Sequence, residues 1–239
     1  MSAHPLLLQQ FSLLRLLSAE ALNQIAPLAS TRDFAKREMV LAKGPPVPYL
    51  CFLMEGRLQA IDFTLDGREV GLYFIEPGDY FGELSLIDGE AQPEFVIATG
   101  RARVVLLPGA EIRPVLFSSP QLAEALSKRL AQRVRQQLNQ RQILAVNNPL
   151  HRICAQLQIM IGGTPGQTPQ QLIIKAPTHQ ELAIMVNLTR ETVTRTFQVL
   201  LAQGVLTRQG DQLLVDKIKL EKLAQSGGKN DPVTRNGEQ

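Results

Sequence analysis

Arg190, Glu191 and Arg195 are charged residues that lie within two turns of a segment with helical periodicity. An arginine can donate two hydrogen bonds to N7 and O6 of guanine, and a glutamate can accept one from the amino group of cytosine. Each good pair discriminates against the wrong base by about 1–3 kcal/mol. The three side chains therefore favour direct reading of base edges in DNA, with a Glu191–Arg195 ion pair on a solvated surface as the alternative.

The apolar residues of the same segment indicate which face is left for that reading. Val193, Phe197 and Leu200 follow the spacing i, i+4, i+7, so we expect them to face a core. The opposite, exposed face then comprises Arg190, Glu191, Thr194, Arg195 and Gln198.

A second helix is expected just before this one. Thr178 and Glu181 have the spacing of a capping box, in which the hydroxyl accepts from the Glu181 amide and the carboxylate reaches back. Asn187 suits a tight turn, Thr189 can cap the following helix, and Gly204 can end it. Two capped helices joined by a tight turn predict a helix-turn-helix.

The surrounding segments complete a small domain. Pro149 can start a helix over HRICAQLQIMI, GGTPGQTPQQ reads as a flexible turn, and LIIKA reads as a short strand. The segment GVLTRQGDQLLV predicts two strands that turn at Gln209, Gly210 and Asp211. A helix-turn-helix followed by such a wing predicts a winged helix.

Charge is distributed unevenly along the chain of 239 residues, whose formal net charge is +3. Residues 1–120 carry 10 Lys/Arg and 14 Asp/Glu, whereas residues 121–226 carry 13 Lys/Arg and 6 Asp/Glu. Positive charge is therefore concentrated in the half that holds the helix-turn-helix, where it can neutralise phosphates. A basic face that is merely solvated is the alternative.

The N-terminal half has the pattern of a β-domain. Short apolar runs from Phe34 to Pro108 are separated by glycines about every 11 residues, which favours an antiparallel barrel or jelly roll. Asp66-Gly67 is the best hairpin turn among them.

A long helix is expected between the two halves, because residues 121–147 contain neither Gly nor Pro. Its apolar residues recur every four positions, so the apolar stripe drifts around the helix. Such a helix can pack on its own β-domain at one end and on a partner at the other; an ordinary core helix of a monomer is the alternative. The stripe comprises Leu122, Leu126, Leu130, Val134 and Leu138.

Other classes of function lack the residues they need. No P-loop, nucleophile–base pair or cluster of metal ligands is found, so we expect neither an enzyme nor a metal site. Cys51 and Cys154 stand alone in apolar surroundings and are expected to fill cores. The apolar start lacks the features of a secretory signal, and no apolar run reaches about 20 residues. A cytoplasmic protein without a membrane span is the simplest interpretation.

Three segments together resemble the cyclic-AMP receptor/FNR (CRP/FNR) family of bacterial transcription regulators, over nearly the whole chain. THQELAIMVNLTRETVTRTFQVL is similar to the family's helix-turn-helix, and GDYFGELSLIDG to the phosphate-binding segment of its effector pocket. LAVNNPLHRICAQL is similar to its hinge between the long helix and the DNA-binding domain.

The resemblance implies an α+β fold and a domain order. Residues 1–119 would form a cyclic-nucleotide-binding-like β-roll and 120–147 a dimerisation helix. Residues 148–226 would form a winged helix-turn-helix, followed by a disordered tail, 227–239. It also implies a homodimer that regulates transcription on double-stranded DNA, with RNA polymerase as a further partner.

The resemblance also assigns roles to residues. Arg190, Glu191 and Arg195 match positions that read a TGTGA-type half-site, in a palindrome whose half-sites lie about one helical turn apart. The effector pocket would include Gly82, Glu83, Leu84 and Ser85. Positions that hold the DNA backbone are matched by His179, Gln180, Thr189 and Thr192.

The effector pocket departs from the pattern of family members that bind cyclic AMP. Those members carry an Arg-Ser-Ala run that neutralises the cyclic phosphate, where this chain has Gln92, Pro93 and Glu94. Gln137 and Leu138 replace the hydroxyl residues expected to contact adenine. We therefore expect no cyclic-AMP binding of the usual kind and no required cofactor.

The remaining effector chemistries are open. An iron–sulfur cluster would need several cysteines before Cys51, and a haem would need a suitable His or Cys near the β-domain. The effector could then be a cyclic dinucleotide, or the protein could have no effector at all. The alternative function is a nucleotide-responsive sensor whose helical domain contacts protein.

Overall fold

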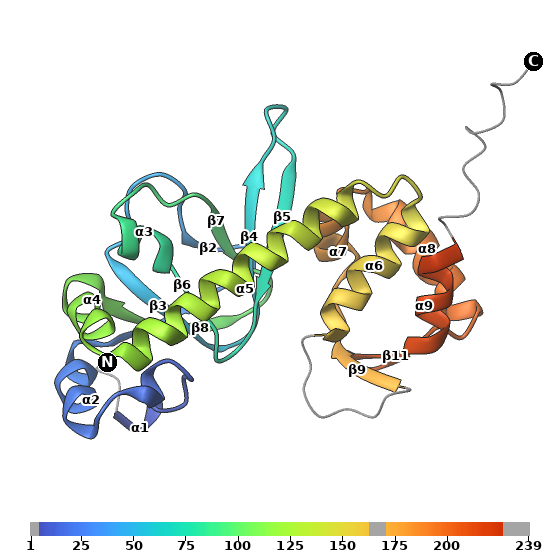
Figure 1. Cartoon of the computed structure of the whole chain (residues 1–239). Coiled ribbons are helices and arrows are strands. Elements are labelled where there is room, and N and C mark those ends of the chain that lie inside the picture. Colours follow the sequence, from blue (N-terminus) through green and yellow to red (C-terminus); the bar gives the residue numbers. More distant parts are fainter. Residues whose placement is uncertain (1–4, 163–170, 227–239) are drawn as a thin grey trace, which may run out of the picture. The chain divides into compact units, whose positions relative to one another are not determined.

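The computed structural model describes residues 5–162 and 171–226. The chain divides into two compact units, Met1–Gln137 and Leu138–Gln239, which are described separately below (Figure 1). The predicted tail, most of the turn at GGTPGQTPQQ and His4 lie outside the described residues.

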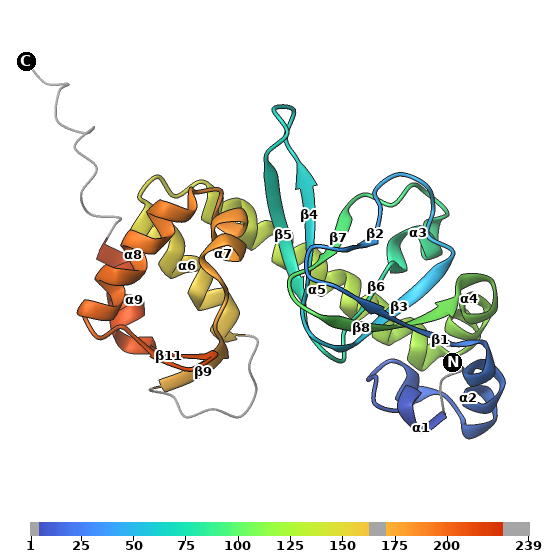
Figure 2. The same ribbon diagram turned by 180° about the vertical axis from the view of Figure 1, so that it is seen from behind.

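The first unit is built on two antiparallel four-stranded sheets, as the glycine-punctuated pattern predicts (Figure 2). One sheet has the order β1 (Ser30–Phe34), β8 (Ala102–Pro108), β3 (Tyr49–Glu55), β6 (Tyr80–Phe81). The other has the order β2 (Met39–Leu41), β7 (Phe95–Ala98), β4 (Leu58–Phe63), β5 (Glu69–Ile75). The turn at Asp66-Gly67 joins β4 to β5, so the predicted hairpin is confirmed.

Short helices accompany these sheets. Near the N-terminus they are α1 (Pro5–Leu8), the 3-10 turn η1 (Leu14–Leu16), α2 (Ala19–Ile25) and the 3-10 turn η2 (Ala26–Leu28). Two more, α3 (Glu83–Asp88) and α4 (Gly109–Ser118), follow β6 and β8. Phe11 of the N-terminal segment packs its ring 4.9 Å from that of Phe52 on β3, which joins the N-terminal helices to the sheet core.

The long helix α5 (Pro120–Leu144) shows the predicted drift of its apolar stripe. Leu122 and Leu126 are buried against the core of the first unit, whereas Val134 is 59% exposed and Leu138 is 53% exposed. The helix ends at Leu144, before the expected boundary at 147, and Val146 closes a tighter turn by bonding the carbonyl of Ile143.

The second unit is a winged helix. Its helices are α6 (Pro149–Gly162), α7 (His179–Val186), α8 (Arg190–Ala202) and α9 (Lys217–Ser226). Its sheet has the order β10 (Leu206–Gln209), β11 (Gln212–Asp216), β9 (Gln171–Lys175), so the predicted wing and strand are confirmed. One apolar core holds the helices and the sheet together; it includes Ile153, Leu157, Leu182, Val193, Leu200 and Val215.

Both cysteines are buried and unpaired, as expected of core residues. Burial raises the pKa of the Cys154 thiol to about 11 and raises that of Cys51 further. In residues 5–162 and 171–226, no helix has the length and apolar character needed to cross a bilayer. Within those same ranges, no group of three or more His, Cys, Asp or Glu side chains is placed to hold a metal ion.

Candidate nucleic-acid interface

The N-terminus of α7 is fixed by the predicted capping box. The Thr178 hydroxyl accepts from the Glu181 amide at 3.2 Å, and the Glu181 carboxylate accepts from the Thr178 amide at 2.6 Å. Because these bonds satisfy amides that have no partner inside the helix, they define where α7 begins. The apolar side of α7 is buried from Leu182 to Val186.

The turn between α7 and α8 has the geometry that its residues favour. Asn187 adopts a left-handed conformation with φ of 49°, which Asn tolerates better than most residues. Thr189 then caps α8, its hydroxyl accepting from the Thr192 amide at 3.2 Å. The two caps and the turn together confirm the predicted helix-turn-helix.

Side chains from two other helices hold the end of α7. The Arg152 guanidinium donates to the carbonyl of Val186 at 3.1 Å and to that of Val146 at 2.8 Å. The Gln140 amide, on a buried side chain, donates to the carbonyl of Met185. The last carbonyls of a helix have no partner within it, so these donors satisfy them and fix the turn. The hydrophobic periodicity did not predict this role for Arg152 or Gln140, because the polar residues of their helices are expected to face water.

The face of α8 proposed to read bases is exposed. Val193 and Leu200 are completely buried and Phe197 is nearly so, whereas Arg190, Glu191, Arg195 and Gln198 are exposed. Thr194 differs from the expectation, because it is half-buried and lies 2.8 Å from Nδ1 of His179. Among the ion pairs within the described ranges, none joins Glu191 to Arg195, so both side chains are available to a partner.

Residues matched to DNA-backbone contacts lie at the N-termini of the two helices, where amides favour anions. Gln180 and Thr189 are exposed and Thr192 is half-buried, its hydroxyl 2.9 Å from that of Thr189. His179 is half-buried, with its ring 4.9 Å from that of Phe197.

The electrostatic environment of His179 shows that Arg208 belongs to the same surface, which the sequence analysis did not identify. Desolvation lowers the pKa of His179, and the positive charges of Arg208 and Arg190 lower it further. Arg208 lies on the wing strand β10 and is exposed, so the wing brings a second cation to the same surface as Arg190. The sequence feature that could have identified Arg208 is its position next to the predicted turn of the wing.

The candidate effector residues lie where β6 meets α3. Gly82 has φ of 81°, and a Cβ there would lie 3.1 Å from the Tyr49 carbonyl oxygen, so backbone geometry explains this glycine. Glu83 is 2% exposed, and Leu84 is half-buried. The buried Ser85 hydroxyl accepts from the Val47 amide at 3.1 Å. Of these four candidate effector residues, only Glu83 has an ionisable side chain, and that side chain is buried.

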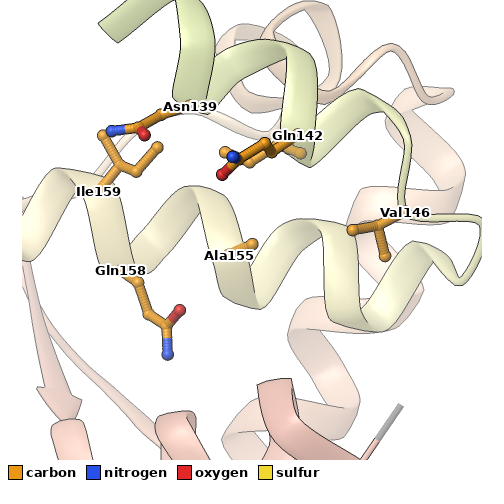
Figure 3. A pocket seen from close by; sticks show the side chains of 7 residues that line it. Asn139, Gln142, Val146, Ala155, Gln158 and Ile159 are labelled. Atoms are coloured by element: carbon orange, nitrogen blue, oxygen red, sulfur yellow. The ribbon is translucent and has the colours of Figure 1, made fainter. Parts of the chain in front are cut away.

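A separate groove of about 350 Å³ lies between the end of α5 and α6 (Figure 3). It is lined by neutral side chains: Asn139, Gln142, Ile143, Val146, Ala155, Gln158 and Ile159. The groove therefore lacks the cations that phosphate recognition requires, and the charged surface of α8 and the wing remains the candidate interface.

Comparison with known proteins agrees with both units. Residues 31–119 match the cyclic nucleotide-binding domain, and residues 151–224 match the Crp-like helix-turn-helix domain. The transcriptional regulator SdrP of Thermus thermophilus is 30% identical over 205 residues, which cover 83% of this chain and 96% of that protein.

Two further relatives show the same relationship. A CRP-like cAMP-activated global transcriptional regulator of Mycobacterium tuberculosis is 27% identical over 184 residues, 77% of this chain and 82% of that protein. The crystal structure of TTHA1359, a CRP/FNR-family transcriptional regulator of Thermus thermophilus, superposes with a TM-score of 0.61 at 27% identity. That superposition covers 83% of this chain and 100% of the other. The chain therefore belongs to the CRP/FNR family of transcription regulators and carries the family's helix-turn-helix DNA-binding domain.

Proposed function

We propose that this regulator binds a palindromic TGTGA-like site as a homodimer, with Arg190, Glu191 and Arg195 reading the bases. The observation that carries the proposal is the exposure of these three side chains on α8 while Val193, Phe197 and Leu200 anchor the helix. A helix held in this way presents its N-terminal residues to the major groove, where base edges are distinguishable.

The contacts with the DNA backbone would surround the three base-reading side chains of α8. Gln180 and His179 lie at the start of α7, and Thr189 and Thr192 lie at the start of α8. Helix N-termini attract phosphate through their free amides and dipole. These contacts set the register of the protein on DNA but carry no sequence information themselves.

Dimerisation would use the exposed part of the α5 stripe. Val134 and Leu138 are large apolar side chains left more than half exposed in the single chain. Burying them against a second α5 would pair two helix-turn-helix units on a two-fold symmetric site, with half-site centres roughly 34–36 Å apart. On bound DNA the dimer would act on transcription with RNA polymerase as its partner, in the cytoplasm.

Cyclic AMP would not be the usual trigger. The relative from Mycobacterium tuberculosis is described as cAMP-activated. This chain instead places a neutral Gln92 and an acidic Glu94, both buried, in the segment that follows α3. A cyclic phosphate in a dry pocket needs a cation or several donors. The buried cation here, Arg133, lies beside Glu83 and also acts on Glu94, so two carboxyl groups would compete with a phosphate for its charge.

The test is binding of the full-length protein to a labelled duplex with two TGTGA half-sites, followed by fluorescence anisotropy at fixed salt. Arg190→Ala and Arg195→Ala should each weaken binding about 5–150-fold, which corresponds to roughly 1–3 kcal/mol. Each should also lose discrimination against a changed base pair at one position of the half-site. Arg101→Ala, which removes an exposed arginine from the first unit, serves as the control.

Two results would reject the proposed reading. One is equal binding to the palindrome and to a scrambled duplex by the wild-type protein. The other is a loss on Arg190→Ala that is the same for every sequence, because a phosphate contact alone behaves in that way.

A further inference from the structure

The side chain of His179, at the start of α7, is held by two contacts from α8. Its Nδ1 lies 2.8 Å from the hydroxyl oxygen of Thr194. The centre of its ring lies 4.9 Å from that of the Phe197 ring, at an interplanar angle of 52°. Among the described residues, the other ring nitrogen, Nε2, has no hydrogen-bond partner. Nε2 is therefore the ring nitrogen that is left for a partner outside the chain.

The Thr194 hydroxyl also contacts a backbone carbonyl. It lies 2.9 Å from the carbonyl oxygen of Arg190, one turn earlier on α8. A carbonyl oxygen can only accept, so the hydroxyl must donate its single hydrogen to make this bond. The hydroxyl oxygen can then only accept from His179, which requires a hydrogen on Nδ1. Both bonds form together in this arrangement alone.

This arrangement determines which form of His179 can bind a phosphate. With its hydrogen on Nδ1, the neutral ring has a lone pair and no hydrogen at Nε2. The phosphodiester oxygens of DNA accept hydrogen bonds and do not donate them, so the neutral ring cannot bind one through Nε2. Protonation at Nε2 supplies a donor and a positive charge at the same atom, and the bond to a phosphate is then charge-assisted.

The charges that act on the ring come from two other elements. Arg190 belongs to α8 and Arg208 to the wing strand β10. Of the acids nearby in the sequence, Glu181 closes the capping box of α7, and Glu191 is exposed on α8. Desolvation, followed by the two arginines, lowers the pKa of His179 below 6.5. The ring is therefore mainly neutral at pH 7 in the free protein.

We propose that a proton at Nε2 of His179 is a ligand that controls DNA binding, and that Thr194 makes this proton necessary by keeping Nδ1 as the donor to its own hydroxyl. Thr194 is a positioning residue, because it acts on DNA through His179. The regulator would then respond to acidification through its DNA-binding unit, without a small molecule in the first unit. The inference rests on the proposed function, because it requires that His179 contact a DNA phosphate.

The two bonds of Thr194 also set the size of the effect. A neutral ring can donate from Nε2 only if the Thr194 hydroxyl turns to donate to Nδ1, and its bond to the Arg190 carbonyl is then lost. One neutral hydrogen bond corresponds to a factor of about 2–13 in an equilibrium constant. The protein with neutral His179 should therefore bind DNA more weakly by this factor than it would without the Thr194 hydroxyl.

The form of the ring can be measured in the full-length protein without DNA. Long-range proton–nitrogen correlation spectra of isotope-labelled protein show which ring nitrogen carries the hydrogen, and His179→Gln identifies the signals of His179. At mildly alkaline pH we expect the hydrogen on Nδ1 in the wild-type protein. Thr194→Val removes the hydroxyl at similar volume and should abolish this preference, whereas Thr194→Ser should keep it.

Two results of this measurement would overturn the proposal. One is a neutral His179 whose hydrogen lies on Nε2 in the wild-type protein. The other is a preference for Nδ1 that Thr194→Val leaves intact. The first result needs no variant, so the proposal can be rejected even if Thr194→Val does not fold.

The effect on DNA is the ratio of the affinities at mildly acidic and mildly alkaline pH, from anisotropy titrations of the palindromic duplex. This ratio should be about 2–13-fold smaller in Thr194→Val than in the wild-type protein. Taking the ratio cancels any loss of affinity that is equal at both pH values. Thr194→Ser should have the ratio of the wild-type protein.

Thr196→Val is the matched control. The Thr196 hydroxyl makes the same kind of bond, to the carbonyl of Thr192 at 2.9 Å, and among the described residues it has no hydrogen bond to a histidine. Its ratio should therefore equal that of the wild-type protein. A ratio that falls equally in Thr196→Val and Thr194→Val would contradict the proposal, because it would assign the effect to α8 in general.

The failure of this proposal is distinguishable from that of the proposed base reading. A ratio in Thr194→Val equal to that of the wild-type protein would overturn the proposal and leave base reading by Arg190 and Arg195 in place. Equal affinity of the wild-type protein for palindromic and scrambled duplexes, with the smaller ratio in Thr194→Val on both, would reject only the base reading. A phosphate contact does not depend on the sequence of the duplex.

Discussion

The guanidinium of Arg152 on α6 donates a hydrogen bond to the carbonyl of Val186, the last residue of α7, at 3.1 Å. Gln140 on α5 donates to the neighbouring carbonyl of Met185. The C-terminus of the first helix in the helix-turn-helix is therefore capped by side chains from α6 and from the end of α5. These bonds hold the end of α7, from which the turn at Asn187 leads into α8.

Arg152→Ala should destabilise the second unit by about 1–3 kcal/mol, because it leaves carbonyls at a partly buried helix end without a charged donor. It should also weaken DNA binding, since α7 and α8 would no longer share a fixed turn. Urea denaturation followed by circular dichroism measures the first effect. Arg141→Ala removes an exposed arginine from α5 and serves as the control; an equal change in both variants would show that the Arg152 bonds contribute nothing.

Gly82→Ala should destabilise the first unit by about 1–3 kcal/mol, whatever effector the protein binds. The backbone at Gly82 has φ of 81°, and the new Cβ would lie 3.1 Å from the Tyr49 carbonyl oxygen. Gly100→Ala is the matched control, because nothing lies within 4 Å of a Cβ built there. Equal midpoints of urea unfolding for Gly82→Ala and the wild-type protein would show that this backbone position is not strained.

Thr189→Ala should cost about 0.5–2 kcal/mol of stability through loss of the α8 cap. If Thr189 also contacts the DNA backbone, the variant should weaken binding to specific and scrambled duplexes by the same factor. Thr189→Ser keeps the hydroxyl and should retain both stability and affinity. A serine variant as unstable as the alanine variant would mean that the methyl group, and not the cap, stabilises the helix.

Local chemistry explains which features could be predicted from the sequence. The capping box at Thr178 and the left-handed turn at Asn187 depend on residues only a few positions apart, so the local sequence is enough to predict them. The β-strands followed from glycine turns in the same way. Helix α3 was not predicted, because its six residues are too few to show periodicity against the surrounding strands.

The buried arginine shows why other features could not be predicted. Arg133 lies on a helix whose polar residues mostly face water, and nothing near it in the sequence indicates burial. Its partners Glu83 and Tyr73 are far away in the chain and become neighbours only through the sheet topology. Sequence reasoning identified Gln92 and Glu94 as a departure from the family pattern, but not the cation that accompanies it.

The affinity for DNA should increase as pH falls through the pKa of His179. Desolvation, Arg208 and Arg190 hold this pKa below its ordinary value of 6.5 in the free protein. DNA phosphates beside the ring would raise it, so binding would take up a proton between the two pKa values. The gain in affinity is limited to about tenfold per pH unit for a single proton.

The stability of the free protein should change with pH in the opposite direction to its affinity for DNA. Because folding lowers the pKa of His179, the unfolded chain binds more protons below pH 6.5, and stability should fall as pH drops through that range. Anisotropy titrations at several pH values measure the effect on DNA binding, and urea unfolding measures the effect on stability. His179→Gln should flatten both responses. Affinity that rises equally on acidification in His179→Gln and in the wild-type protein would assign the proton to another group and remove His179 from the DNA contact.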